Sequence, residues 1–309
     1  LHLSIRRQRQ MCIRDSKKTF SDLAKKKRKG PLTIISATDM SSGARFDFIQ
    51  ETFDFICSDL NRFPISRAVA ASSAVPLLFS PVTLWNYAGT CDFHVPDTLM
   101  AAADNKKRGR IAAVSRTRAK ELFSYLDPIK RPYIHLLDGG LSDNLSIRSI
   151  LDMEALVGSE EVRQDFRLDE MEKLVLVVVN AQNNPENTID QSADVPGWRD
   201  VIRAISDIPI ARYTQETELA MQSSIERWQE AARLRAEQNN TAPPSVYYIN
   251  VSLKNMTDEE KRIDLLNVPT SLYLPKKTVR ELRGAATTLL HESPEFRRLL
   301  KDISAKQGD

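Results

Sequence analysis

The chain has 309 residues, of which 41% are hydrophobic and 28% are charged, with 10 Gly and 15 Pro. This composition excludes collagen-like, low-complexity and disordered classes and predicts a globular protein, with one α/β domain as the default for this length. The longest apolar run, Leu174–Val179, is far shorter than the roughly 20 residues of a membrane-spanning helix, so we expect no span.

The formal net charge of +3 is unevenly distributed along the chain. Residues 1–30 hold eleven Lys or Arg and two Asp, which leaves the remainder acidic. The cluster Lys25–Lys29 either attracts anionic lipid head groups or nucleic acid, or lies in solvent as a loop. Because no aromatic residues interleave with these charges, we expect no nucleic-acid partner, and peripheral membrane contact stays open.

The first residues are interpreted as foreign to the fold. Met11–Ser16 reads as the translation of a transposon-end adapter used in DNA sequencing libraries, so residues 1–16 are excluded from fold reasoning. A native basic leader is the alternative. We therefore divide the chain into a leader, 1–30, and one domain, 31–309.

Cysteine and histidine spacing predicts neither a metal site nor another cofactor. Cys12, Cys57 and Cys91 are odd in number and show no CxxC or CxxH spacing, so the sequence supports neither a disulfide framework nor a zinc site. The four histidines are scattered, without a pair at metal-ligand spacing. The redox compartment stays open.

Beyond Pro31 the hydrophobic pattern is that of an α/β protein. A turn is expected at Asp39–Gly43, and a helix over Ile65–Ala74 that ends at Pro76. The expected strands are Leu32–Ala37, Phe46–Phe55, Val82–Trp85, Tyr133–Leu137, Lys173–Ala181 and Val246–Leu253. The other expected helices are 104–126, Leu145–Leu156, a region from Trp198 interrupted near Pro209, Ile210–Glu237, Lys276–Leu290 and Pro294–Ile303.

Two of these elements carry a stronger expectation. Lys173–Ala181 is apolar on both faces, which is typical of a central strand in a parallel sheet. In the long helical region, apolar and small residues recur at helical spacing, and we interpret this stripe as core rather than as a ligand site. Its members are Tyr213, Thr217, Met221, Trp228 and Ala232.

The candidate chemistry begins at Asp138. A carboxylate at the end of a buried strand is followed by Gly139 and Gly140, which permit a tight turn and the close approach of another group. Reacting groups of α/β sheets lie at such positions. The alternative is an aspartate that only caps the next helix or stabilises the turn.

Two further blocks accompany this motif. Ser66–Pro76 reads SRAVAASSAVP, and Leu137–Asn144 reads LDGGLSDN some sixty residues later. Together with Ala37–Asp39 and Gly43, they resemble signature blocks of the bacterial patatin-like phospholipases, in the right order. The resemblance is clear over residues 31–150, and only topological over 151–309, which we assign to the same domain.

The resemblance implies a three-layer α/β fold with a mostly parallel sheet and helices on both faces. It also implies a serine esterase with a Ser-Asp dyad, in which a serine in a GxSxG elbow attacks a lipid acyl ester and the aspartate of a DGG motif is its base. Asp138 matches that aspartate. An aspartate in a partly desolvated site can accept the serine proton directly.

The chain departs from the family pattern because no two of its glycines flank a serine as GxSxG requires. The glycine-rich oxyanion loop is missing as well. Ser72 and Ser73 lack flanking glycines, and we interpret them as packing or helix-capping residues. We therefore expect a hydrolase fragment that is incomplete at its N-terminus, inactive as given and prone to aggregate.

Two other functions stay open, namely a non-catalytic relative that binds lipid or protein, and a basic surface-binding protein unrelated to lipids. Head-group and acyl-chain contacts are loop features without a readable code. The sequence therefore fixes neither the particular ester substrate, nor the oligomeric state, nor the cellular compartment.

Overall fold

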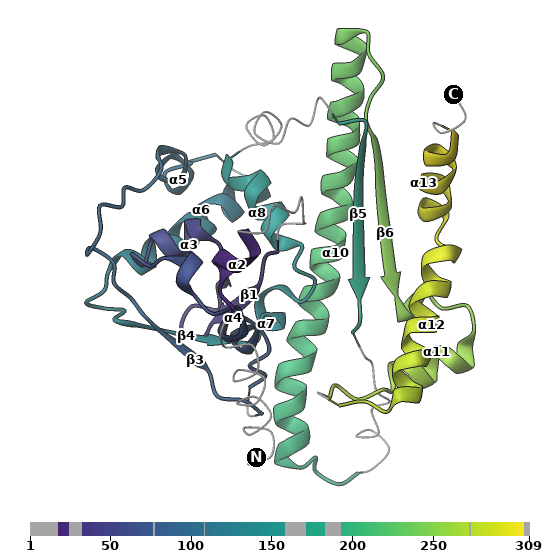
Figure 1. The fold of residues 1–309 in the computed structure, drawn as a ribbon, viewed down its shortest axis with the longest axis horizontal. Coiled ribbons are helices and arrows are strands. Elements are labelled where there is room, and N and C mark those ends of the chain that lie inside the picture. Colours follow the sequence, from purple (N-terminus) through teal and green to yellow (C-terminus); the bar gives the residue numbers. More distant parts are fainter. Residues whose placement is uncertain are drawn as a thin grey trace. The chain divides into compact units, whose positions relative to one another are not determined.

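The computed structural model describes residues 18–24, 33–76, 78–107, 109–157, 171–182, 193–271 and 273–305. The adapter-like stretch and the cluster Lys25–Lys29 lie outside these ranges. The protein is a mixed α/β structure that divides into two compact units. The first unit comprises Leu1–Phe166 and Ala204–Thr217, and the second comprises Arg167–Arg203 and Glu218–Asp309. Figure 1 shows the elements with their labels.

The first unit contains a four-stranded sheet in the order β2-β1-β4-β3. Every strand pair in it is antiparallel, where a mostly parallel sheet was expected. The physical reason begins with β1 and β2, because a tight turn joins them and only antiparallel neighbours can be joined that way. The strands are β1 (Ser36–Asp39), β2 (Arg45–Asp47), β3 (Val82–Trp85) and β4 (Tyr133–Leu137).

The expected turn over Asp39–Gly43 is confirmed. The Gly43 amide donates to the Asp39 carbonyl at 2.8 Å, and Gly43 has a φ of +71°, a left-handed conformation that glycine adopts without steric cost. The strand before the turn begins later than expected, at Ser36. Its partner β4 is aligned so that Thr38 lies opposite Leu137, immediately before Asp138.

The expected strand over Phe46–Phe55 is wrong in its second half. After β2 the chain forms the helix α3 (Gln50–Asp54), which buries Phe53. The Phe53 ring packs 6.0 Å from the ring of Phe46 and 5.4 Å from that of Phe63. Burial of this aromatic group overrides the alternating pattern, since a helical turn brings the ring back to the core.

The remaining helices of the first unit surround this aromatic core. The helix α4 packs against the sheet through β1, β4 and β3. The helices are α2 (Phe20–Ala24), α4 (Ile65–Ser72), α5 (Asp97–Ala103), α6 (Arg110–Phe123), α7 (Gly140–Asp143) and α8 (Arg148–Val157), with short 3₁₀ turns η1 (Leu60–Arg62) and η2 (Ser124–Leu126).

The helix α2 lies within the segment assigned to the basic leader. Phe20 is buried, its amide donates to the Phe63 carbonyl at 3.2 Å, and the Ile65 amide donates to the Lys18 carbonyl at 3.0 Å. Residues 18–24, which the sequence placed in the leader, therefore pack on the first unit, with Phe20 in its core.

Cys57 and Cys91 form a disulfide, which the sequence analysis did not support. Their Cα atoms lie 5.6 Å apart although 34 positions separate them in sequence. Spacing motifs detect only cysteines that are local in sequence. This pair is brought together by the packing of the segment after α3 against the turn that follows β3, where the Tyr87 amide donates to the Ile56 carbonyl.

The second unit is built on the parallel pair β5 (Lys173–Asn180) and β6 (Ser245–Ser252), which run in the same direction in Figure 1. One side of β6 packs against two helices, which bury Tyr247, Ile249 and Val251. The helices of this unit's C-terminal part are α11 (Glu259–Leu266), α12 (Lys276–Glu292) and α13 (Pro294–Ala305), and η5 (Leu253–Asn255) follows β6.

The expectation that Lys173–Ala181 is a central strand is not met within the described residues. There β5 has a single strand neighbour, and Val175, Val177 and Val179 are 40%, 51% and 64% exposed. These three side chains alternate with partly or fully buried ones, so one face of this all-apolar strand lacks a covering layer in the described part of the chain.

The expected interruption at Pro209 is wrong, because α10 runs unbroken over Trp198–Asn239. Proline removes one backbone donor and disfavours a helix interior, yet here the helix continues on both sides of it. Part of the expected core stripe is confirmed. Thr217 and Met221 are buried, whereas Tyr213 is 39% exposed. None of the described helices is long and apolar enough to cross a membrane.

Candidate functional site

The three sequence blocks meet at one point in the first unit, the turn after β4. The Asp138 amide donates to the Ala74 carbonyl at 3.0 Å, and the Gly139 amide donates to the Ser72 carbonyl at 3.1 Å. The Thr38 hydroxyl donates to the Asp138 carbonyl at 2.7 Å. Backbone and hydroxyl contacts therefore fix the Asp138 turn from two sides, through the end of α4 and through β1.

A pair of buried hydroxyls lies beneath this turn. The oxygens of Thr38 and Ser142 are 2.8 Å apart, and both residues are buried. The Ser142 hydroxyl also contacts the Gly139 carbonyl at 3.4 Å. This pair joins β1 to α7, and the sequence analysis assigned it no role. In the sequence, the only indication of this contact is that Thr38 lies in the motif Ala37–Asp39 and Ser142 in the motif Leu137–Asn144.

The two glycines of the motif are needed for space. A Cβ atom on Gly139 would lie 2.4 Å from the Ser36 carbonyl oxygen, which is backbone and cannot move aside. A Cβ on Gly140 would meet the side chains of Asn144 and Asp138 at 3.0 and 3.1 Å. Gly139 therefore allows β1 to approach the turn closely, and the sequence predicted such a close approach.

The Asp138 carboxylate is half-buried. Its Oδ1 accepts one hydrogen bond, from the Gly140 amide at 2.8 Å. Burial raises the pKa of Asp138 above its ordinary value, and the Gly140 amide opposes this effect only in part. In the described part of the chain, no serine, histidine, lysine or arginine side chain bonds to this carboxylate. It is a partly desolvated group with acceptor capacity to spare, as a general base requires.

Ser72 and Ser73 lie at the end of α4, next to the turn. The Ser73 hydroxyl donates to the Val69 carbonyl at 2.8 Å, within its own helix. The Ser72 hydroxyl lies 3.5 Å from the position a Cβ on Gly139 would take. Ser73 therefore bonds within its own helix and Ser72 lies beside the turn, and neither hydroxyl has a hydrogen bond to Asp138 in the described structure.

A buried ionic network holds α7 and α8 against the sheet. The Arg45 guanidinium lies 2.8 Å from Asp47, 2.9 Å from Asp152 and 3.8 Å from Asp143. Arg118 of α6 adds a contact to Asp47 at 3.4 Å. Burial raises the pKa of Asp143, although Arg45 and two backbone amides lower it. Because removing one member leaves buried charge unpaired, this network fixes the helix that follows the Asp138 turn.

This network was not predicted from the sequence. Its signal is the alternation of Arg45 and Asp47 with Phe46 and Phe48 along β2 and the residue after it, which places two opposite charges among buried rings. Charged residues are almost never fully buried unless they are paired, so such a strand marks a paired interior.

Helix α10 supports the same region through residues that belong to the first unit. Arg148 of α8 donates to the Thr217 hydroxyl at 2.9 Å and stacks over the Tyr213 ring at 3.7 Å. The Asn144 amide donates to the Thr214 hydroxyl at 3.3 Å. Residues after the Asp138 turn are thus anchored by hydroxyl and aromatic groups of α10, of which Tyr213 and Thr217 belong to the predicted stripe.

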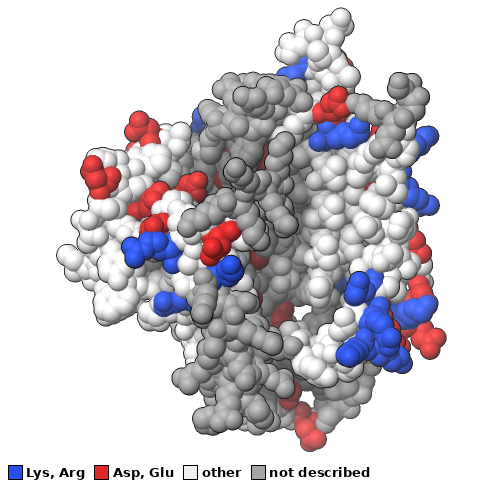
Figure 2. All heavy atoms as spheres, viewed as in Figure 1, with Lys and Arg blue, Asp and Glu red and all other residues white. Residues whose placement is uncertain are grey.

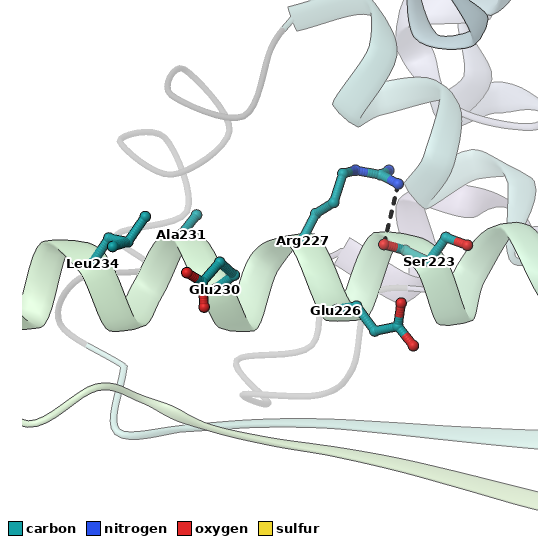
Figure 3. A pocket seen from close by; sticks show the side chains of 6 residues that line it. All are labelled: Ser223, Glu226, Arg227, Glu230, Ala231 and Leu234. Carbon is teal, nitrogen blue, oxygen red and sulfur yellow. Dashed lines mark hydrogen bonds between the residues drawn. The ribbon is translucent and has the colours of Figure 1, made fainter.

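Two shallow cavities lie away from Asp138. One, of about 560 Å³, is lined by one face of α10, and Figure 3 shows that Arg227 reaches back along this helix to the Ser223 carbonyl, at 3.1 Å. Glu230 of this lining pairs with Arg233 at 2.8 Å, and the lining matches none of the sequence motifs. The other, of about 520 Å³, lies in the first unit. The described residues hold no group of three His, Cys, Asp or Glu side chains that could bind a metal ion.

Surface charge in the second unit is mixed. Figure 2 shows Lys and Arg side chains beside Asp and Glu side chains over the region of α11 and α12. Several of these charges form local ion pairs, Lys261 with Asp258 at 2.9 Å and Arg262 with Glu259 at 2.6 Å. Such exposed pairs neutralise one another and add little to stability.

Comparison of the chain with protein-family models, with curated proteins and with solved structures finds no match. The candidate site is therefore defined by its own residues and geometry.

Proposed function

We propose that this chain is the base-bearing part of a lipid acyl-ester hydrolase of the patatin-like kind, with Asp138 as the base of a Ser-Asp dyad. The single observation that carries the proposal is the convergence of three separate motifs on the backbone of the turn that presents the half-buried Asp138 carboxylate. In the complete enzyme, a three-layer fold with a larger parallel sheet would place the nucleophilic serine within hydrogen-bonding distance of this carboxylate.

The proposed reaction has two steps. Asp138 takes the proton of the serine hydroxyl as the oxygen attacks the ester carbonyl, and it gives this proton to the alcohol that leaves as the acyl-enzyme forms. Water then attacks the acyl-enzyme, and Asp138 takes a proton from that water and returns it to the serine oxygen as the fatty acid leaves. The chain itself supplies the base and its support, and the serine and oxyanion donors must come from a segment that this sequence does not contain.

The first experiment is to sequence the source DNA upstream of the codon for Pro31. The proposal predicts an in-frame glycine-rich loop and a strand-GxSxG-helix joined to the segment near Lys18. A genuine start codon with the leader unchanged would contradict it and would favour the second candidate, a lipid- or protein-binding relative without catalysis. The absence of GxSxG in the sequence is the observation that favours this second candidate.

The second experiment measures hydrolysis of a short acyl ester, p-nitrophenyl butyrate. We expect no turnover by the chain as given and turnover by the extended protein. In the extended protein Asp138→Asn should lower kcat by about 10²–10⁴-fold, which is the usual contribution of a general base. Asp92→Asn is the matched control, because the Asp92 side chain is 99% exposed. Full activity in a folded Asp138→Asn variant would refute the dyad, and vesicle binding without turnover would support the non-catalytic relative.

A further inference from the structure

The second cavity described above lies at the opposite end of β1 from Asp138. Gly139 packs against Ser36, the first residue of β1, whereas the cavity lies beyond Asp39, the last residue. It is formed by the β1–β2 turn, the last turns of α6, η2 and the segment before β4. Its lining residues are Ser41, Ser42, Thr117, Lys120, Glu121, Ser124 and Arg131.

Six of these seven residues carry hydrogen-bond donors on their side chains, two as cations and four as hydroxyls. The Ser42 hydroxyl oxygen accepts from the Ala44 amide at 3.2 Å, so its proton is free to point outward. The Ser124 hydroxyl donates to the Glu121 carbonyl at 2.6 Å and is already engaged. The cavity is thus rich in donors and poor in free acceptors.

Arg131 is fixed in position by contacts with the protein interior. Its guanidinium donates to the buried carboxylate of Asp39 and to the Ser124 hydroxyl, and it stacks on the Tyr125 ring at 4.7 Å. Asp39 is fully buried and also accepts from the Ser41 amide at 2.9 Å and from the Tyr125 hydroxyl at 3.0 Å. An arginine anchored in this way loses little side-chain entropy when its remaining N–H groups bind a ligand.

The charged residues around the cavity differ in whether they already have an ion-pair partner. Asp39 is occupied by Arg131, and Glu121 accepts from Arg118 at 3.2 Å. No ion pair of Lys120 with a described residue is present, and its side chain is exposed at the mouth. The C-terminal end of α6 contributes partial negative charge, which weakens anion binding. The Ser124 hydroxyl and amide cover the Glu121 carbonyl there, which reduces that effect.

We propose that this cavity binds a phosphate group, with Lys120 and Arg131 as its cationic ligands and the hydroxyls of Ser41, Ser42 and Thr117 as donors to the remaining oxygens. Arginine and lysine together with hydroxyls match the charge and the acceptor oxygens of a phosphate monoester. The phosphate belongs either to a lipid head group or to a small soluble molecule. This proposal is independent of the hydrolase proposal, since the site is separate from Asp138.

The test uses the full 309-residue chain and two probes. Inorganic phosphate binding is followed by ³¹P NMR line broadening and calorimetry. Vesicles of phosphatidylcholine with and without phosphatidic acid are followed by co-sedimentation. Lys120→Gln should weaken binding about tenfold, the loss expected for one charged hydrogen bond. Lys130→Gln, which removes the same charge from a side chain that is 83% exposed and outside the lining, should bind as the parent does.

Saturable phosphate binding that Lys120→Gln weakens supports a soluble ligand. Binding only to vesicles with phosphatidic acid, again sensitive to Lys120→Gln, supports a lipid head group. The proposal is overturned if neither probe binds, or if Lys120→Gln and Lys130→Gln have the same effect. Because Lys120 and Ser41 are exposed, a second variant, Ser41→Ala, keeps the fold and should weaken the same binding.

Discussion

Two aspartates of the first unit differ in what surrounds their carboxylates. Burial alone would raise the pKa of Asp39, but Arg131, the Ser41 amide and Tyr125 outweigh it and lower that pKa. Asp138 has only the Gly140 amide against burial, so its pKa is raised. The partners of Asp39 therefore favour its charged form, whereas Asp138 takes up a proton more readily than an exposed aspartate does.

The raised pKa of Asp138 gives a prediction on stability. A carboxyl whose pKa is higher in the folded state stabilises the fold below its unfolded pKa, and that contribution is lost as pH rises through the folded value. We expect Asp138→Asn to raise the melting temperature at pH 7, and the difference from the parent to vanish below the ordinary value of 3.8. Thermal denaturation across this pH range measures it. A variant less stable than the parent at pH 7 would show that the carboxylate has partners that stabilise its charge.

The same shift gives a prediction on catalysis in the extended protein. The base must be unprotonated to act, so kcat/KM should fall on acidification, beginning at a higher pH than for an exposed aspartate. A pH–rate profile measures the apparent pKa. A profile that stays flat down to the ordinary aspartate range would exclude Asp138 as the base.

Among the elements, the turn between β4 and α7 depends most on a single residue. Gly139→Ala places a methyl group against the Ser36 carbonyl and should destabilise the first unit by about 1–3 kcal/mol, as overpacking does. Gly284→Ala in α12 is the matched control, because no atom lies within 4 Å of its added Cβ. That change should stabilise the helix by about 0.5–1 kcal/mol. Urea denaturation of both variants measures the contrast, and equal effects would remove the steric argument.

The strand β5 is the element most exposed to self-association. Within the described residues one edge of β5 is unpaired, and its exposed valines add apolar surface of the kind that favours pairing with another chain. We expect Val177→Lys to reduce aggregation while changing the free energy of unfolding by no more than about 0.5 kcal/mol. Val178→Lys, at a position only 5% exposed, should prevent folding of the second unit. Light scattering and size-exclusion chromatography measure the aggregation of Val177→Lys. Unchanged aggregation of this variant would show that another surface causes the self-association.

At the scale of the whole molecule, the disulfide closes a loop that spans most of the segment between α3 and the turn after β3. For a loop of 34 positions, removing the bond by the change Cys57→Ser with Cys91→Ser should destabilise the first unit by about 3–4 kcal/mol. Urea denaturation with and without a reductant measures the loss, and the double variant should be insensitive to the reductant. Because the chain has three cysteines, three titratable thiols in protein denatured without a reductant would contradict the bond.

The sequence by itself determined those elements that depend only on residues close to one another in the chain. Val82–Trp85 and Tyr133–Leu137 are strands with the predicted bounds, because β-branched and aromatic residues lie there between proline and polar residues. The turn at Asp39–Gly43 follows from the glycine that adopts a positive φ. The closeness of Gly139 to another chain segment also followed from sequence, since two consecutive glycines after a strand imply crowding.

Only the tertiary structure decided the rest, because those features depend on contacts between distant residues. The helix at Gln50–Asp54 forms because Phe53 must reach the aromatic core. The disulfide forms because folding brings Cys57 to Cys91. The direction of strand pairing, the ionic network of Arg45 and the contacts that fix the Asp138 turn likewise arise from long-range packing. Sequence periodicity reports which face of an element is buried, but not which partner buries it.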